Sequence, residues 1–319
     1  MRTLLLQQTA FSWTRLSSLS TLANEIARFD SDCGVTVART PPGSWYVNEG
    51  IYELEKSTVF AKNWVSVNGA HHLNKPGDFI TGFLGDEPYL IGKDTPDRIH
   101  YFYNICRHHG TLLCDAPKGF AKEYVCPYHA WKYALDGRLT GAKRLKGIED
   151  FSVRNYGLKK FSGTNWFGSL FLNQDTEADV SQFHHQMEEL RQRLKALGCE
   201  EDKLTHVGSK TFPLNCNWKV VIDNYLDGGY HVPVCHTGLN DLLENGTYST
   251  EVYDGFSIQT TGGNNSDSRV GTQSLYAHIY PNLFINRYGN WLDINYVLPT
   301  GPQTCDVLFD WFLDTDFHD

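Results

Sequence analysis

Two short segments of the sequence each bring one cysteine and one histidine close together. Cys106 and His108 lie in the first segment, and Cys126 and His129 lie in the second. Two thiolates and two imidazoles suit either a tetrahedral zinc site or a [2Fe–2S] cluster with thiolates on one iron and imidazoles on the other. Neutral imidazoles carry less negative charge than thiolates, so such a cluster has a raised reduction potential.

A second pair of potential metal ligands is His231 and His236. On a uniform helix, five steps of about 100° would place the two side chains about 140° apart, so they could not reach one metal. Gly228, Gly229 and Pro233 provide the irregularity that would let them converge. Two imidazoles and one carboxylate form the facial triad of non-haem Fe(II) oxygenases.

The first pair of segments resembles a Rieske domain. The match runs through Cys106-x-His108, Gly110, Leu112 and Cys126-Pro127-Tyr128-His129-x-Trp131-x-Tyr133-x-x-Asp136-Gly137. This extended context favours a [2Fe–2S] cluster over zinc. The resemblance implies that Cys106 and Cys126 hold one iron and that His108 and His129 hold the other. His109 and Ala130 stand where many members have Arg and Gly, but neither change removes a ligand.

The segment from Asn224 to His231 resembles the mononuclear-iron motif of Rieske non-haem iron oxygenase α-subunits, most closely the choline monooxygenase group. The resemblance implies that His231 and His236 bind mononuclear Fe(II). In the family, an acidic residue just before the first histidine bridges the two metal centres between neighbouring subunits. We assign this catalytic role to Asp227, although many members carry the acid at the position of Gly228. Asp223 is the second candidate, or else a helix-start carboxylate satisfied by backbone donors.

The third iron ligand of the family is an aspartate in a later helix, and no segment after His236 resembles that helix. We therefore expect a C-terminally truncated chain, with the resemblance covering roughly residues 40–319. Two histidines without a carboxylate would bind Fe(II) more weakly, so the motifs alone do not establish activity. The late acidic residues are interpreted as solvated charges at strand ends: Asp310, Asp314, Asp316 and Asp319.

The hydrophobic pattern predicts an α+β fold: an antiparallel Rieske β-domain followed by a catalytic domain with an antiparallel sheet and helices. We expect an N-terminal segment over 1–40, the Rieske domain over 41–175 and an incomplete mononuclear-iron domain over 176–319. Helices are predicted at 51–62, at 181–197 with Gly198 as the stop, and near 217–227. Strands are predicted at 64–67, 79–80, 89–91, 99–103, near 276–298 and at 305–313.

Composition narrows the class of protein and its compartment. The 319 residues carry a net charge of −9, which argues against broad nucleic-acid binding. No apolar run is long enough for a transmembrane helix, and eight cysteines are too sparse for a disulfide scaffold. Residues 1–24 contain no acidic side chain and resemble an organellar transit peptide, the alternative being an unstructured terminus. We expect a soluble protein of the plastid stroma or mitochondrial matrix, with the cytoplasm as the alternative.

Two further patterns concern the substrate and the electron donor. Between His100 and Gly147 there are eight basic and three acidic residues, a net charge of +5. This surface could dock an acidic ferredoxin, or it could be ordinary solvated loop charge. The late strands carry aromatic residues that could bind a quaternary ammonium by cation–π attraction or simply fill a core. These residues are Tyr276, Tyr280, Phe284, Tyr288, Trp291, Tyr296, Phe309, Trp311 and Phe312.

The resemblance implies a homotrimeric oxidoreductase that takes electrons from ferredoxin or a ferredoxin-type reductase. It implies a monooxygenase that uses O2 to convert choline to betaine aldehyde, a reaction of glycine betaine biosynthesis. One alternative is a related Rieske oxygenase acting on carnitine, a betaine or an aromatic ring. Another is a truncated electron-transfer protein or inactive subunit that lacks the third iron ligand.

Overall fold

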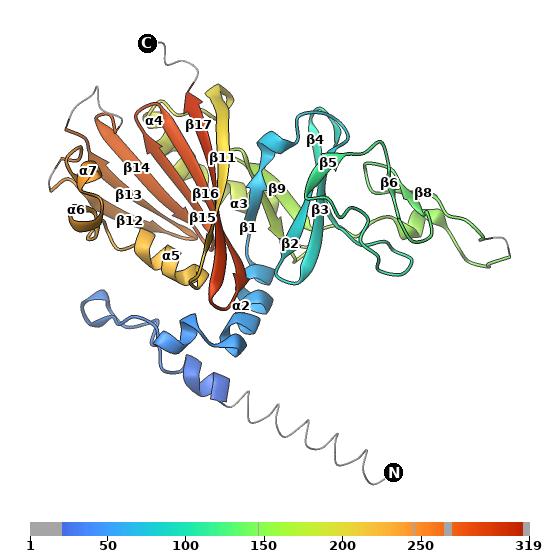
Figure 1. Ribbon diagram of the computed structural model, residues 1–319, viewed down its shortest axis with the longest axis horizontal. Helices are drawn as coiled ribbons and strands as arrows, with labels where there is room; N and C mark the ends of the chain where they lie inside the picture. The colour runs from blue at the N-terminus through green and yellow to red at the C-terminus, as the bar shows by residue number, and fades with distance from the viewer. Residues whose placement is uncertain (1–20, 146, 245, 265–269, 315–319) are drawn as a thin grey trace, which may run out of the picture.

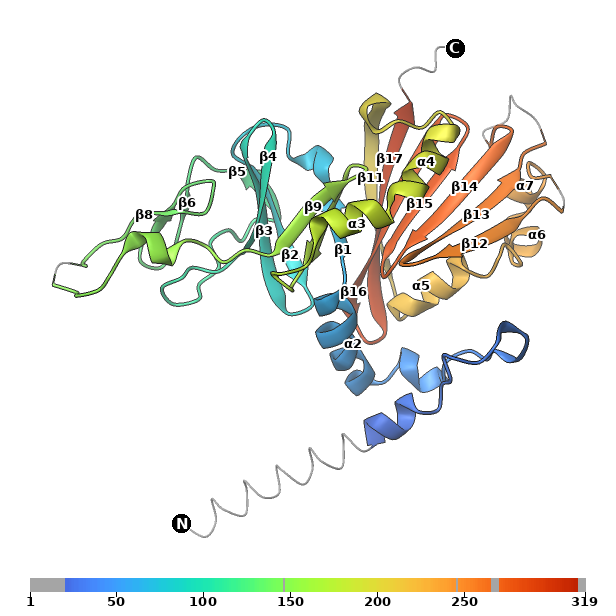
Figure 2. The same cartoon turned by 180° about the vertical axis from the view of Figure 1, so that it is seen from behind.

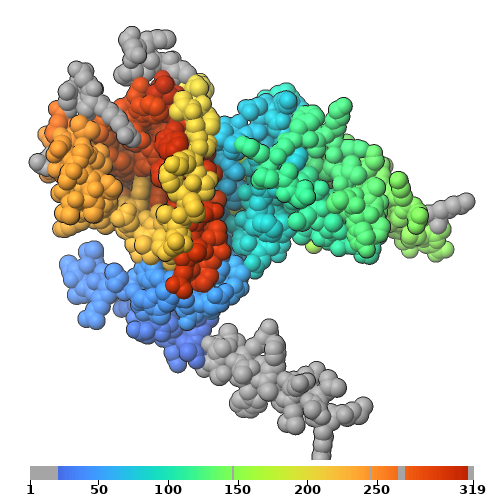
Figure 3. All heavy atoms as spheres, in the orientation of Figure 1, coloured from blue at the N-terminus to red at the C-terminus, as the bar shows by residue number. Residues whose placement is uncertain are grey.

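The computed structural model describes residues 21–145, 147–244, 246–264 and 270–314. Most of the stretch interpreted as a transit peptide lies outside these residues. Two β-rich halves lie side by side, with α2 beneath their junction (Figure 1). Figure 2 gives the same arrangement from behind, and Figure 3 shows the cyan and green part of the chain projecting from the larger body. The α+β class is confirmed, whereas the division at 40/41 and 175/176 stays a prediction.

The longest helix of the N-terminal half is the predicted one, α2 (Glu49–Lys62). Asn48 caps this helix, because its side chain accepts hydrogen bonds from the backbone N–H groups of Gly50 and Ile51. Antiparallel strands follow in three sheets, ordered β4-β3-β2-β5, β6-β7-β8 and β1-β10-β9. They are β1 (Val65–Gly69), β2 (Asp78–Leu84), β3 (Glu87–Thr95), β4 (Arg98–Tyr103), β5 (Lys118–Phe120), β6 (Tyr124–Val125), β7 (Lys132–Tyr133), β8 (Leu139–Gly141), β9 (Ser162–Trp166) and β10 (Ser169–Asn173).

The predicted helix at 181–197 is two helices, α3 (Val180–Gln186) and α4 (Glu188–Ala196). Met187 interrupts them with a ψ of −1°, although its N–H still donates to the carbonyl of Phe183. Gly198 ends α4 as predicted, because its φ of +71° is a conformation that glycine adopts at little cost. One-turn 3-10 helices complete this half and the connection: η1 (Val35–Val37), η2 (Gly43–Tyr46), η3 (Ala70–His72), η4 (Val153–Tyr156) and η5 (Glu201–Lys203).

The C-terminal half is a seven-stranded antiparallel sheet in the order β11-β17-β16-β15-β14-β13-β12. The predicted strands near 276–298 and 305–313 are present, and the helix near 217–227 is α5 (Trp218–Tyr225). The sheet strands and remaining helices are β11 (Leu204–Leu214), α6 (Val232–Cys235), α7 (Thr237–Asn240), β12 (Ser249–Tyr253), β13 (Phe256–Gly262), β14 (Gln273–Ile279), β15 (Leu283–Tyr288), β16 (Trp291–Gly301) and β17 (Thr304–Asp314).

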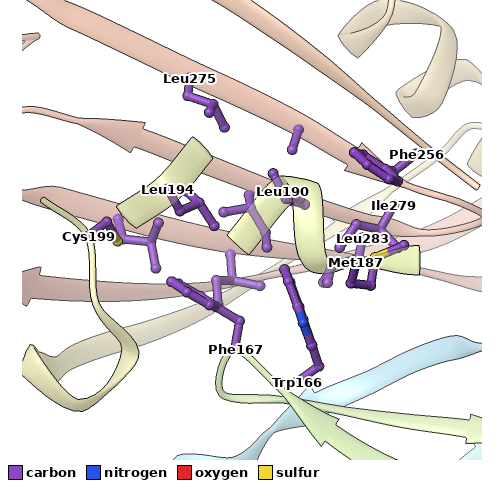
Figure 4. Close-up of a cluster of buried hydrophobic side chains, with 14 of the residues drawn as sticks. Trp166, Phe167, Met187, Leu190, Leu194, Cys199, Phe256, Leu275, Ile279 and Leu283 are labelled. Atoms are coloured by element: carbon purple, nitrogen blue, oxygen red, sulfur yellow. The ribbon is translucent and has the colours of Figure 1, made fainter. Parts of the chain in front are cut away.

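Alternation along the strands gives the sheet two different faces. One face packs on α3 and α4, where Met187, Leu190 and Leu194 meet strand residues such as Leu275 and Leu283 (Figure 4). Because successive side chains point to opposite sides of a strand, their neighbours face the other way, toward α5, α6 and α7. The residues of that second face include Gln259, Tyr276, Asn286, Asp293 and Phe309.

The interpretation of Asp310 and Asp314 as solvated charges is wrong. Asp310 has an exposed fraction of 0% and Asp314 of 7%. Ser209 Oγ donates a hydrogen bond to Asp310 Oδ1, and Arg287 donates one to Asp314 Oδ2 at 3.1 Å. Both carboxylates are buried because β17 is an interior strand of the sheet. Asp316 and Asp319 lie outside the described residues.

Among the described helices, none combines the length and the apolar character that crossing a bilayer requires.

Candidate functional site

The two Cys/His segments form loops of the same shape, here called the cluster loops (residues 106–110 and 126–130). In the first, the N–H of Gly110 donates to the carbonyl of Cys106 at 3.0 Å. In the second, Ala130 makes the same bond to Cys126, also at 3.0 Å. Each cysteine N–H donates in turn to the residue five positions later, at 2.8 Å. The repeated backbone pattern presents one thiol and one imidazole from each loop to the same place.

Each loop turns at its fifth residue through the left-handed region. Gly110 has a φ of +74° and Ala130 a φ of +54°. A side chain in this region crowds the following carbonyl oxygen, so glycine is the residue that fits best. Ala130 therefore makes the second loop more strained than the first.

The side chains of the cluster loops divide into a buried and an exposed layer. Cys106 and Cys126 are each only 2% exposed, whereas His108 and His129 lie at the surface. The rings of the two histidines have centroids 4.8 Å apart. Burial, together with the adjacent Cys126, raises the pKa of the Cys106 thiol. Two adjacent buried thiols under two exposed imidazoles fit the ligand set of a [2Fe–2S] cluster of mixed ligation.

Tyr133 and Trp131 support this layer. The Tyr133 hydroxyl lies 3.3 Å from Cys106 Sγ and accepts a hydrogen bond from the Arg107 N–H at 3.0 Å. When Cys106 is a thiolate, as it is in a cluster, the hydroxyl is the donor to the sulfur. The Trp131 ring stacks on His108 at a centroid distance of 4.7 Å and an angle of 6°. Both contacts limit the freedom of the residues that could hold a cluster.

The second histidine pair converges as the sequence predicts. Gly228 and Gly229 have φ values of +74° and +80°, so the chain breaks between α5 and α6. His231 precedes α6, and His236 follows it with a φ of −127° and a ψ of 55°. Their ring centroids are 5.1 Å apart, close enough for both rings to reach one metal ion.

Asp227 contacts His231 directly, with Oδ2 2.5 Å from Nδ1. Burial opposes ionisation of this carboxyl, but hydrogen bonds from His231 and the Gly229 N–H outweigh it and lower the pKa of Asp227. Asp223 lies elsewhere: it is exposed near the end of α5 and accepts a hydrogen bond from the Tyr46 hydroxyl at 2.5 Å. Its interpretation as a helix-start carboxylate is therefore wrong.

A cavity of about 560 Å³ opens beside His231 and His236 on the second face of the sheet. Its walls are aromatic and aliphatic, and five tyrosine and phenylalanine rings contribute: Tyr225, Tyr248, Tyr276, Tyr288 and Phe309. Three of these were among the candidate substrate aromatics, whereas Phe284, Tyr296 and Phe312 belong to the core.

The floor of the cavity carries a polar network centred on the buried carboxylate of Asp293. Asn286 Nδ2 and Asn295 Nδ2 donate to Asp293 Oδ2 at 2.6 and 2.9 Å, and the Tyr288 hydroxyl donates to Oδ1. Tyr225 donates to Asn286 Oδ1 at 2.6 Å, which ties α5 to the network. The sequence analysis missed Asp293. The sequence signal that could have identified Asp293 is its position in β16, where polar residues alternate with buried apolar ones.

Among the described residues, no third metal ligand accompanies the two histidines. Within the described ranges, no carboxylate joins His231 and His236 in a group of three ligand atoms that all lie within 4.8 Å of one another. Of the two histidines, Asp227 contacts only His231, at Nδ1. A metal bound at Nε2 of His231 would lie on the other side of the ring. The described residues thus offer two imidazoles and an outer carboxylate.

The two sites lie at opposite ends of the molecule. The cluster loops sit beside β6 and β8, and the histidine pair flanks α6 at the far edge of the other half (Figures 1 and 2). Fold and sites together define an oxidoreductase with one redox centre in each half.

Comparison with known proteins agrees with this class. The Rieske [2Fe-2S] domain model matches residues 63–156, and the model for the catalytic domain of the ring hydroxylating alpha subunit matches residues 201–318. A chloroplastic choline monooxygenase of Arabidopsis thaliana is 38% identical over 320 residues, covering 96% of this chain and 75% of the relative. The chain belongs to the α-subunit family of Rieske non-haem iron oxygenases, enzymes that use a Rieske cluster and a mononuclear iron.

Relatives with other substrates are also similar. The carnitine monooxygenase oxygenase subunit of Acinetobacter pittii is 31% identical, over 70% of this chain and 59% of the relative. The crystal structure of the quaternary ammonium Rieske monooxygenase CntA with an inhibitor superposes with a TM-score of 0.77. That alignment has 27% identity and covers 87% of this chain and 76% of the other.

Proposed function

We propose that this chain is a monooxygenase that oxidises choline to betaine aldehyde with O2 and electrons from ferredoxin. The observation that carries the proposal is the cavity beside His231 and His236, which combines aromatic walls with the buried carboxylate of Asp293. Aromatic faces and a negative charge both attract a quaternary ammonium. The named function of the Arabidopsis relative supports the same substrate.

The charge of the cavity favours choline over carnitine or a betaine. Those two substrates carry a carboxylate, which requires a cationic partner when it leaves water. Of the described residues that line the cavity, none is Lys or Arg, and Asp293 would repel a second carboxylate. Choline carries only a hydroxyl, for which the amide groups of Asn286 and Gln259 are suitable partners.

The ligand assignments follow the geometry. We propose that Cys106 and Cys126 bind one iron of the cluster and that His108 and His129 bind the other. The mononuclear iron is bound by His231 and His236, which flank the two ends of α6. When bound, the cluster supplies single electrons and the mononuclear iron supplies the O2 chemistry. The protein residues fix ring orientation: Asp227 holds the Nδ1 side of His231, so the Nε2 side faces the metal.

Electron transfer between the two centres requires a neighbouring subunit, because the two centres of one subunit lie at opposite ends of the molecule. Exposed apolar side chains occur at both ends: Tyr128 beside the cluster loops is 65% exposed, and Tyr230 and Val234 beside the iron ligands are 89% and 80% exposed. Such residues are typical of protein interfaces. We therefore propose a homotrimer in which the cluster loops of one subunit face Asp227 of the next.

Ferredoxin or a related reductase is the proposed electron donor. Within the basic stretch, Lys132 and Arg138 pair with Glu123 and Asp136 at 2.5 and 2.6 Å, so the remaining basic residues produce the net positive field. Lys118 and Lys122 are two of these remaining basic residues, and both are exposed. The named location of the Arabidopsis relative makes the plastid stroma the proposed compartment.

The test is a substrate comparison with the purified chain, chemically reduced ferredoxin and O2. We expect choline-dependent O2 uptake with betaine aldehyde as the product, and at least about tenfold lower rates with carnitine and glycine betaine. Faster oxidation of either of those two would reassign the substrate. Reduction of the cluster without oxidation of any of the three would point to an electron-transfer protein.

A further inference from the structure

A second group of potential metal ligands lies on the opposite face of the sheet from the catalytic cavity. It consists of His71 from η3, His206 from β11 and Asp310 from β17. His71 Nδ1 lies 3.7 Å from Asp310 Oδ2, and His206 Nε2 lies 3.9 Å from Asp310 Oδ1. The three ligand atoms all lie within 4.8 Å of one another. A tetrahedral zinc ion with bonds of about 2.1 Å separates its ligands by about 3.4 Å, close to these distances.

The group contains buried polar atoms without partners. The Asp310 side chain is 0% exposed and the His71 side chain 13%. Among the described residues, neither ring nitrogen of His71 nor Oδ2 of Asp310 has a hydrogen-bond partner. Such atoms are costly to bury unless an ion or water satisfies them.

Direct hydrogen bonds do not hold the group together. His71 Nδ1 and His206 Nε2 lie 3.7 and 3.9 Å from the nearest Asp310 oxygens, beyond hydrogen-bond distance. Ser209 Oγ donates to Asp310 Oδ1, and Oδ2 faces His71 without a bond. Two imidazoles and a buried carboxyl oxygen at this spacing are suitable ligands for one metal ion.

Two backbone features make room for the group. A Cβ atom on Gly69 would stand 2.4 Å from His71 Nδ1 and 2.6 Å from Asp310 Oδ2, so only glycine fits there. A register shift between His206 and Gly208 forms a β-bulge in β11. Because of that extra residue, His206 and Ser209 point to the same face, with Nε2 and Oγ 2.8 Å apart.

We propose that His71, His206 and Asp310 bind one Zn²⁺, which joins the η3 segment to strands β11 and β17 of the large sheet. Two imidazoles, one carboxylate and a water are a common zinc donor set. The rings of His71 and His206 are stacked at 3.7 Å, so a shared ion requires rotation of one ring about its Cβ–Cγ bond. Ser209 then keeps its bond to Asp310 and releases His206. The site is independent of the proposed reaction.

The experiment measures bound zinc after equilibration of the full chain with zinc and exhaustive dialysis. It is performed on the unmodified chain with iron in its cluster loops, so that those ligands are occupied, and on a His231→Ala/His236→Ala variant, which removes a further pair of histidines that could take zinc. We expect about one zinc per chain in both. Asp310→Asn should lower the retained zinc at least about tenfold. Asp306→Asn, the same change on the same strand, should leave it unchanged.

Iron content and the spectrum of the reduced cluster serve as the folding control. If Asp310→Asn does not fold, His206→Gln replaces a ligand whose side chain is 26% exposed and should also lose the zinc. Absence of zinc from the unmodified chain would overturn the proposal. Retention of zinc by folded Asp310→Asn and His206→Gln variants would overturn it equally.

Discussion

Asp227 Oδ2 and His231 Nδ1 are 2.5 Å apart, so the carboxylate and the proposed iron ligand act as one unit. The contact fixes the tautomer and the direction of the imidazole, as outer carboxylates do for metal-bound histidines. The Gly229 N–H donates to the other carboxylate oxygen at 2.8 Å and holds Asp227 in place. The unusual glycine pair before His231 thus allows the chain to turn and also supplies a hydrogen bond.

Asp227→Asn should slow substrate oxidation by about 10- to 100-fold while the cluster is still reduced at the normal rate. The amide lacks the charge that orients and polarises the His231 ring. Stopped-flow reduction and steady-state turnover separate the two steps. The control is Asp223→Asn, an exposed position on α5 that should keep full turnover. Equal losses in both variants would remove Asp227 from its assigned role.

Tyr133→Phe should lower the reduction potential of the cluster. Hydrogen bonds to the sulfur atoms stabilise the reduced, more negative state. A bond to a charged acceptor is worth about 1.5 kcal/mol, or roughly 60 mV for a one-electron couple. Redox titration followed by electron paramagnetic resonance measures the shift. Tyr128→Phe, which alters an exposed ring, should leave the potential in place; a matching shift there would rule out the Cys106 contact as the cause.

Ala130→Gly should raise the free energy of unfolding by about 1 kcal/mol, because it relieves the left-handed strain in the second cluster loop. Thermal denaturation of the cluster-loaded protein tests this. Ala134→Gly, at a residue outside the left-handed region, should instead destabilise the protein slightly. A loss of stability in Ala130→Gly would show that the turn is not strained.

Asp293→Asn should raise the KM for choline about tenfold and leave the KM for its uncharged analogue 3,3-dimethylbutan-1-ol nearly unchanged. The variant removes the negative charge at the cavity floor but keeps a side chain of similar shape. Asp306→Asn, outside the cavity, serves as the control. An equal rise for the charged and neutral substrates would mean that Asp293 organises the floor and does not attract the cation.

Sequence reasoning succeeded where the chemistry is local. The proposed cluster ligands lie in two short segments, and the break in the chain before His231 follows from Gly228 and Gly229. It failed where function depends on strand register. Asp293 reaches the cavity only because β15 and β16 pair Asn286 with it. Asp310 was taken for a surface charge because an aspartate-rich strand gives no sign that side chains from η3 and β11 lie against it.

In the proposed enzyme, one chain carries two iron centres that are held by separate residues. The most direct test is iron per chain and electron paramagnetic resonance after reduction, on anaerobically purified protein and its His231→Ala/His236→Ala variant. We predict about three irons with a Rieske signal in the first, and about two with the same signal in the second. Identical iron content in both, or no Rieske signal, would contradict the account.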